Sequence, residues 1–327
     1  MLRKLVLYPA GHLALVVPVA LLLGLTTGLV VKVPQIVALQ MPAVLLMVFP
    51  IMIGIPWRSV LTWKPVRLMT ISTLINFVIT PALAWLIGRW FLGDYPAMMG
   101  GLAIASLLPT SGMTISWTVL NGGNAPAAVR ITVLSLLGGS LLMPLYLIVM
   151  VGQRVPLDIP LTLARVGMMV IVPMILGTVT YAFLQKRYTA EEFQAQIKPF
   201  LPAVSVWAML YVVFISTASR ARYLLADPKA IVVGLLTLLL FYLVCFAVST
   251  LLGRWFLSEA DSYTLIYSTV LLNLSIALGT SLALFGAQAA FLVTLAFILQ
   301  VQAASLYGRV ARRFSFFSPT AGAAKAS

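Results

Sequence analysis

Apolar runs of about 20 residues recur along the whole chain, and each has the length that a helix needs to cross a bilayer core. The runs lack the short period-two alternation of a barrel strand, so helices are the spanning structure that remains. The sequence therefore predicts an all-α membrane protein. We expect ten transmembrane helices at approximately 12–31, 38–56, 68–91, 96–120, 126–151, 163–184, 199–218, 230–252, 263–285 and 288–308.

Composition agrees with this interpretation. The 327 residues are 62% hydrophobic and 9% charged, whereas soluble domains carry roughly 25% charged residues. Mean hydropathy is +1.08. We expect the first run to remain as a helix because it is long and has no clear cleavage site of small residues. The net charge of +14 does not indicate a nucleic-acid partner, because the basic residues are scattered singly in loops and at helix ends.

The distribution of Lys and Arg predicts that both termini are cytoplasmic. With ten helices and the N-terminus inside, cytoplasmic positions hold 13 of the 21 basic residues and the opposite side holds 7, while Arg130 falls inside the fifth segment. Cytoplasmic loops of membrane proteins carry such an excess. We expect an integral protein of the plasma membrane (the bacterial inner membrane), in contact with lipid, whose cytoplasmic tail at 314–327 is disordered. The oligomeric state stays open.

One pentapeptide, Gly-Arg-Trp-Phe-Leu, occurs at 88–92 and again 165 residues later, at 253–257. It ends the third helix of each half, and Met-Pro-Ala-Val at 41–44 has a similar echo at 201–204. Arg89 and Arg254 themselves are typical of interfacial anchors. An odd number of helices per half places the halves in opposite orientations, as in many secondary transporters. We expect a first five-helix repeat at 12–151 and a second, inverted repeat at 163–308.

Two matching segments carry signals of interrupted helices. In segment four, Pro109 removes a backbone donor and Gly112 loosens the helix, with hydroxyl side chains around them. Segment nine carries Gly279 among amide and hydroxyl side chains at a similar depth. Such stretches in matching helices indicate a binding site, although ordinary helix packing also uses small and hydroxyl residues. The candidate binding residues are Thr110, Ser111, Thr114, Asn273, Ser275, Thr280 and Ser281.

Four stretches of the chain carry a family resemblance: NFVITPALAW at 76–85, GLAIASLLPTSGMTISWTVLNGGN at 101–124, SLLGGSLLMPLYL at 135–147 and NLSIALGTSLALFGAQAAF at 273–291. They resemble the bile acid:sodium symporter family and its wider superfamily, which includes the arsenite exporters. The resemblance implies a panel domain and a core domain, with segments four and nine broken and crossing near the site. It also implies sodium ligands from segments three, four, five and nine.

Transferred one position at a time, the sodium ligands of the family are only partly present in this chain. Asn76, Thr114 and Thr132 keep a suitable amide or hydroxyl group, which makes them the candidate sodium ligands. The carboxylate that symporters share with arsenite exporters corresponds to Ser275. Three further ligand positions hold residues without a matching ligand atom, namely Ile115, Ala128 and Gly279.

Charged residues near the membrane core are scarce. Asp227 precedes Pro228 and is expected to cap segment eight. We hypothesise that Arg130, about one turn into segment five, supplies the positive charge that sodium supplies in relatives. The other interpretation is that Arg130 reaches the cytoplasmic interface. All seven acidic residues fall in expected loops or at helix ends: Asp94, Asp158, Glu191, Glu192, Asp227, Glu259 and Asp261.

The expected function is secondary active transport of a small organic anion by alternating access, with Na+ as the one cofactor that the sequence leaves open. Arsenite export is the alternative. Trivalent arsenic favours sulfur ligands, but Thr110 stands where a thiolate is expected and the single cysteine, Cys245, lies on segment eight. An enzyme is not expected, because the only histidine is His12 and no cluster of metal-binding or acid–base residues is apparent. No feature favours a receptor that does not transport.

Overall fold

The computed structural model describes residues 2–31, 39–56, 62–152, 160, 164, 167–314 and 316–317. Within these ranges the chain forms helices and no strands, which agrees with the predicted all-α membrane protein. Prolines occupy the first turn of several helices, where the missing N–H would have no partner within the helix.

The first half of the chain ends with a long helix, α9. Its elements are α1 (Leu2–Gly11), α2 (Leu13–Val30), α4 (Gln40–Met52), α5 (Val66–Leu74), the π-helical turn η2 (Ile75–Ile79), α6 (Thr80–Phe91), α7 (Pro96–Leu107), α8 (Gly112–Leu120) and α9 (Ala125–Met150).

The second half begins with a π-helical turn and ends near the C-terminus. Its elements are η3 (Gly167–Ile171), α11 (Val172–Leu184), α12 (Ala190–Glu192), η4 (Phe193–Ile197), α13 (Phe200–Ala226), α14 (Pro228–Phe256), α15 (Glu259–Val270), α16 (Leu274–Phe285) and α17 (Ala287–Arg313).

Each expected apolar segment coincides with one helix or with consecutive helical elements in the described ranges. Six stretches of these ranges are long and apolar enough to cross a membrane, or seven if the bent pair of α7 and α8 counts as one span. Three further apolar helices are shorter, at Leu15–Val30, Pro42–Met52 and Val172–Leu184. Ten complete crossings therefore stay a prediction. Parts of the segments expected at 38–56 and 163–184 lie outside the described residues.

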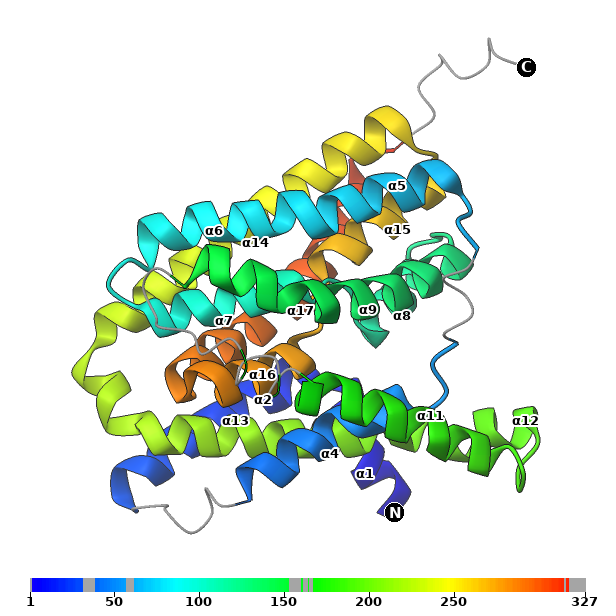
Figure 1. Cartoon of the computed structure of the whole chain (residues 1–327). Helices are drawn as coiled ribbons and strands as arrows, with labels where there is room; N and C mark the ends of the chain where they lie inside the picture. The colour runs from blue at the N-terminus through cyan, green and yellow to red at the C-terminus, as the bar shows by residue number, and fades with distance from the viewer. Residues whose placement is uncertain are drawn as a thin grey trace.

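The helices lie in two layers (Figure 1). One layer contains α2, α4, α11 and α13; the other contains α6, α7, α9, α14, α15 and α17, with α16 between the two. Gly24 and Gly28 of α2 allow close packing in the first layer, because an added Cβ would lie 2.5 Å from the carbonyl oxygen of Phe214 and 2.1 Å from that of Ala218.

The two copies of the pentapeptide end their helices with the same backbone hydrogen bond. At the end of α6, the N–H of Leu92 donates to the carbonyl of Gly88 at 2.8 Å. At the end of α14, the N–H of Leu257 donates to the carbonyl of Gly253 at 2.9 Å. The tryptophan of each copy is exposed, as expected of an interfacial anchor. The cap residues differ in backbone conformation, with a ψ of 23° at Leu92 and of 161° at Leu257, and the repeat stays a prediction.

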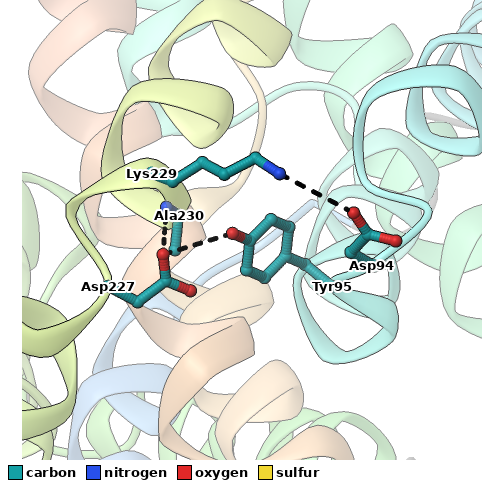
Figure 2. Close-up of polar contacts among 5 residues, drawn as sticks. All are labelled: Asp94, Tyr95, Asp227, Lys229 and Ala230. Atoms are coloured by element: carbon teal, nitrogen blue, oxygen red, sulfur yellow. Dashed lines mark hydrogen bonds and ion pairs between the residues drawn. The ribbon is translucent and has the colours of Figure 1, made fainter.

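The predicted cap of α14 is confirmed (Figure 2). Oδ1 of Asp227 accepts hydrogen bonds from the N–H of Ala230 at 3.2 Å and from the hydroxyl of Tyr95 at 3.3 Å. Nζ of Lys229 lies 4.0 Å from Oδ2 of Asp94. These contacts join the turn after α6 to the start of α14. The charged side chains of the ion pair are exposed, so the pair contributes little to stability.

Three residues of the tail expected to be disordered, Phe314, Phe316 and Phe317, lie within the described ranges. Phe317 is buried, and its ring lies edge-on to that of Tyr263 with 5.1 Å between the centroids. The beginning of the tail therefore packs against α15. The other residues of 314–327 lie outside the described ranges.

Candidate transport site

Segment four is broken as predicted. It forms α7 and α8, which meet at an angle of 58°. Between them, Pro109 has no backbone N–H to continue a helix. Thr110 adopts a φ of 74°, a left-handed conformation that costs a residue with a Cβ about 1–2 kcal/mol. The N–H of Ser111 donates to Oγ1 of Thr114 at 3.0 Å, which closes the start of α8.

Segment nine is also interrupted, but at residues 271–273 instead of at Gly279. Asn273 caps α16, because its Oδ1 accepts a hydrogen bond from the N–H of Ile276 at 3.3 Å. Gly279 lies inside α16, where an added Cβ would lie 2.5 Å from Cγ1 of Val44 in α4. This glycine therefore serves close packing between the two layers and does not break the helix.

The two breaks lie against each other. The N–H of Asn273 donates to the carbonyl of Leu108 at 2.7 Å. Oγ1 of Thr114 lies 3.3 Å from the carbonyl oxygen of Tyr267 and 3.5 Å from that of Leu271, so the hydroxyl can donate to the end of α15. Each broken segment thus supplies hydrogen-bond partners to the other, and we call this meeting point of residues 108–114 and 267–273 the crossing.

Several predicted site residues present buried polar atoms without a hydrogen-bond partner among the described residues. These atoms are Oδ1 of Asn76, Oγ of Ser111, Oγ1 of Thr280 and Oγ of Ser281. Nδ2 of Asn76 donates to the carbonyl of Ser268 at 3.1 Å, which brings η2 to the crossing. Thr280 and Ser281 lie about two turns along α16 from its start. An unpaired buried polar group costs about 1–3 kcal/mol; a role of these atoms in ligand binding stays a prediction.

Two further candidates, Thr132 and Ser275, contact atoms of other residues. Oγ1 of Thr132 donates to the carbonyl of Ala128 at 2.8 Å, and the carbonyl of Thr132 lies 3.5 Å from Oγ1 of Thr110. Oγ of Ser275 lies 3.9 Å from Sδ of Met209 in α13. Thr132 therefore adjoins the first break, whereas Ser275 faces the opposite layer.

Arg130 lies in the second turn of α9. Its Nη1 donates to the carbonyl of Lys64 at 2.6 Å, in the loop that precedes α5. This contact supports the interpretation that Arg130 reaches the membrane interface. A role of Arg130 at the crossing stays a prediction.

The polar groups that the structure places at the crossing are neutral. The described acidic residues lie in the turn after α6, in α12, at the cap of α14 and in the first turn of α15; Asp158 lies outside the described ranges. Both α8 and α16 begin at the crossing, and a helix N-terminus carries about half a positive charge. Two such ends beside hydroxyl groups suit an anion.

Sequence reasoning missed two kinds of partner at the crossing. The carbonyls of Leu108 and Tyr267 belong to the backbone, so side-chain identity in the sequence does not reveal their role. Gln300 of α17 contacts the break of segment nine through its buried amide. The sequence feature that could have indicated Gln300 is a polar amide within an otherwise apolar segment.

Comparison with known proteins adds a family and two relatives. The family model described as Sodium Bile acid symporter family matches residues 41–227, which include the first break. The chain is 22% identical over 247 residues to the uncharacterized protein YbaS of Bacillus subtilis (strain 168), which covers 75% of this chain and 79% of YbaS. It is 26% identical over 238 residues to the arsenical-resistance protein Acr3 of Corynebacterium glutamicum, which covers 68% of this chain and 64% of Acr3.

Replacing Thr114 by valine is expected to destabilise the folded protein by about 1–3 kcal/mol, because the N–H of Ser111 loses its acceptor, Oγ1 of Thr114. Thermal unfolding of the purified protein in detergent measures the change. Thr114→Ser keeps the hydroxyl and is expected to unfold near the wild-type temperature. The matched control is Thr26→Val, since the exposed hydroxyl of Thr26 donates within its own helix to Leu22. An equal decrease of the unfolding temperature in Thr114→Val and Thr26→Val would contradict the prediction.

Proposed function

The chain belongs to the sodium bile acid symporter family, and we propose that it is a secondary transporter that moves a small organic anion across the membrane by alternating access. The family and the apolar helices make it an integral membrane protein. The observation that carries the choice of an anion is the meeting of the N-termini of α8 and α16 at the crossing.

A carboxylate ligand would find two favourable features at the crossing. The first is the positive end of each helix dipole, which is what α16 contributes, since the N–H groups of Leu274 and Ile276 already donate to the carbonyl of Leu272 and to Oδ1 of Asn273. Ser111, at the start of α8, adds a buried hydroxyl without a described partner. Asn273 holds the start of α16 against the first break. Half-helix N-termini that face an anionic substrate group are a recurring arrangement in transporters.

We propose that sodium is a weakly coupled or uncoupled second substrate. Of the three candidate sodium ligands, Asn76 offers an unpaired oxygen, whereas the hydroxyls of Thr114 and Thr132 already have partners. Ser275 replaces the carboxylate of relatives and faces Met209. Because ligand charge raises the affinity of an oxygen site for a hard cation, a site of neutral oxygens is expected to hold sodium weakly.

Alternating access requires two bodies that move against each other. We propose that α2, α4, α11 and α13 form a panel domain, that the other layer with α16 forms a core domain, and that the repeats 12–151 and 163–308 are inverted. The matching helix breaks and the matching ends of α6 and α14 support this proposal. The excess of Lys and Arg supports cytoplasmic termini in the plasma membrane.

Arsenite export is the second candidate, because one relative is named as an arsenical-resistance protein. Trivalent arsenic favours sulfur ligands. Thr110 occupies the break of segment four, and the only cysteine, Cys245, is buried in α14. The donors at the crossing are therefore better suited to a carboxylate than to arsenite.

Thermal unfolding of the protein in lipid nanodiscs tests the proposed function. The ligands are pyruvate, citrate, a bile acid below its micellar concentration, and arsenite, each in NaCl and in KCl. A ligand that binds only the folded protein raises the unfolding temperature. We expect at least one carboxylate to raise the unfolding temperature equally in NaCl and in KCl. We also expect the protein to take up that carboxylate when reconstituted into proteoliposomes.

Three outcomes would contradict parts of this proposal. A shift with arsenite alone would favour the second candidate. A carboxylate shift that requires NaCl would contradict weak sodium coupling. The absence of any carboxylate shift would remove the support for an organic anion of these classes.

Replacing Asn273 by aspartate adds a negative charge at the start of α16 and keeps the cap, because Asp and Asn cap helices about equally well. We expect an unfolding temperature close to that of the wild type and loss of the carboxylate-induced shift through charge repulsion. Asn273→Ser is neutral and also caps, so it should keep the shift. An aspartate variant that still responds fully to the carboxylate would place the anion elsewhere.

Replacing Arg130 by alanine separates the two interpretations of this residue. Because its guanidinium donates to the loop carbonyl of Lys64, we expect Arg130→Ala to leave the carboxylate-induced shift unchanged. The same nanodisc assay measures it. Loss of the shift in a variant that still folds would instead assign Arg130 the charge-neutralising role that its position in segment five suggested.

A further inference from the structure

Gln300 lies inside α17 with 1% of its surface exposed. Its Oε1 accepts hydrogen bonds from the N–H of Leu272 at 2.9 Å and from the hydroxyl of Tyr242 at 3.0 Å. Its Nε2 donates to the carbonyl of Leu272 at 3.2 Å. One side chain therefore pairs with both backbone groups of a residue in the break of segment nine.

These contacts complete the backbone hydrogen bonding of the break. The neighbouring N–H groups have other partners, since that of Leu271 donates to α15 at 3.3 Å and that of Asn273 donates to the carbonyl of Leu108. Without Gln300, the N–H of Leu272 would lack this acceptor in a region where lipid and packed side chains exclude water. Unpaired backbone groups are strongly disfavoured in such a region.

The first break is supported in a different way. An added Cβ at Gly139 of α9 would lie 2.0 Å from the carbonyl oxygen of Leu107, so the backbone of α9 packs directly on that break. In the repeat register of 165 residues, Gln300 corresponds to Ser135, a buried residue whose short side chain carries no amide. Close backbone packing thus supports the first break, and a side-chain amide supports the second.

We propose that Gln300 is a positioning residue for the transport site. It fixes Leu272 and thereby keeps Asn273 and the N-terminus of α16 against Leu108 of the first break. The role at the site rests on the proposed function, whereas the geometry itself requires no ligand. Loss of the amide should free Leu272 and also weaken the bond between Asn273 and Leu108, which Gln300 does not touch.

Hydrogen–deuterium exchange resolved to single amides, on the full chain in nanodiscs, tests this proposal. Gln300→Met keeps a similar side-chain length but removes the amide. We expect exchange at the N–H groups of Leu272 and Asn273 to become about tenfold faster, because the free energy of local opening is lower without the amide of Gln300. The matched control is Gln302→Met, the same substitution at an exposed position of α17, which should change neither amide.

Two results would overturn the proposal. Faster exchange at Leu272 alone would make Gln300 a local partner without a positioning role. Unchanged exchange at both amides would show that its bonds do not hold the break. Tyr242→Phe removes the hydroxyl and leaves both bonds to Leu272, so both amides should stay protected in that variant.

A second substitution covers the case in which Gln300→Met does not yield folded protein. Gln300→Glu keeps the oxygen that accepts from Leu272 and Tyr242 and replaces the group that donates to the carbonyl of Leu272. We expect faster exchange at Asn273 in this variant too. Wild-type exchange at Asn273 would overturn the proposal here as well.

The test separates this inference from the proposed function. If pyruvate, citrate and a bile acid give no thermal shift with the wild type, the proposed function fails for these anions and the exchange result still decides whether Gln300 positions the break. If the wild-type shift persists undiminished in Gln300→Met despite faster exchange at both amides, the role of Gln300 at the site fails and the anion carrier stands.

Discussion

The backbone of an interrupted helix must find hydrogen-bond partners inside the protein, because lipid offers none. In this structure the two breaks meet that requirement for each other. The N–H of Asn273 donates to the carbonyl of Leu108, and the hydroxyl of Thr114 reaches the end of α15. Either break alone would leave polar groups unpaired. The two interrupted segments therefore stabilise each other through these hydrogen bonds.

This pairing also explains how a site can form without buried charge. Once the breaks are joined, the starts of α8 and α16 face the same region, and each contributes the positive end of a helix dipole. Buried hydroxyls such as that of Ser111 add donors. The described acidic residues lie away from the crossing. The proposed anion site would draw on this positive potential.

Features that depend on neighbours in sequence could be predicted, and features that depend on distant backbone could not. Pro109 removes a backbone donor, which favours a break, and Asp227 caps the helix that follows it. The break of segment nine has no proline. Its position at 271–273 depends on Asn273 and on partners from other helices, so Gly279 was a misleading signal. Likewise, the partner of Arg130 is a backbone carbonyl 66 residues away.

The two halves share a feature at the ends of α6 and α14 and differ at the crossing. The helices α6 and α14 end with the same hydrogen bond. At the crossing, by contrast, the left-handed φ of a non-glycine residue is found at Thr110 of the first break, and the amide support of Gln300 belongs to the second. Strained backbone tends to cluster at functional sites. In the transporter proposed above, a substrate at the crossing would therefore meet different groups at the two breaks. These local differences are therefore the features from which substrate selectivity can arise.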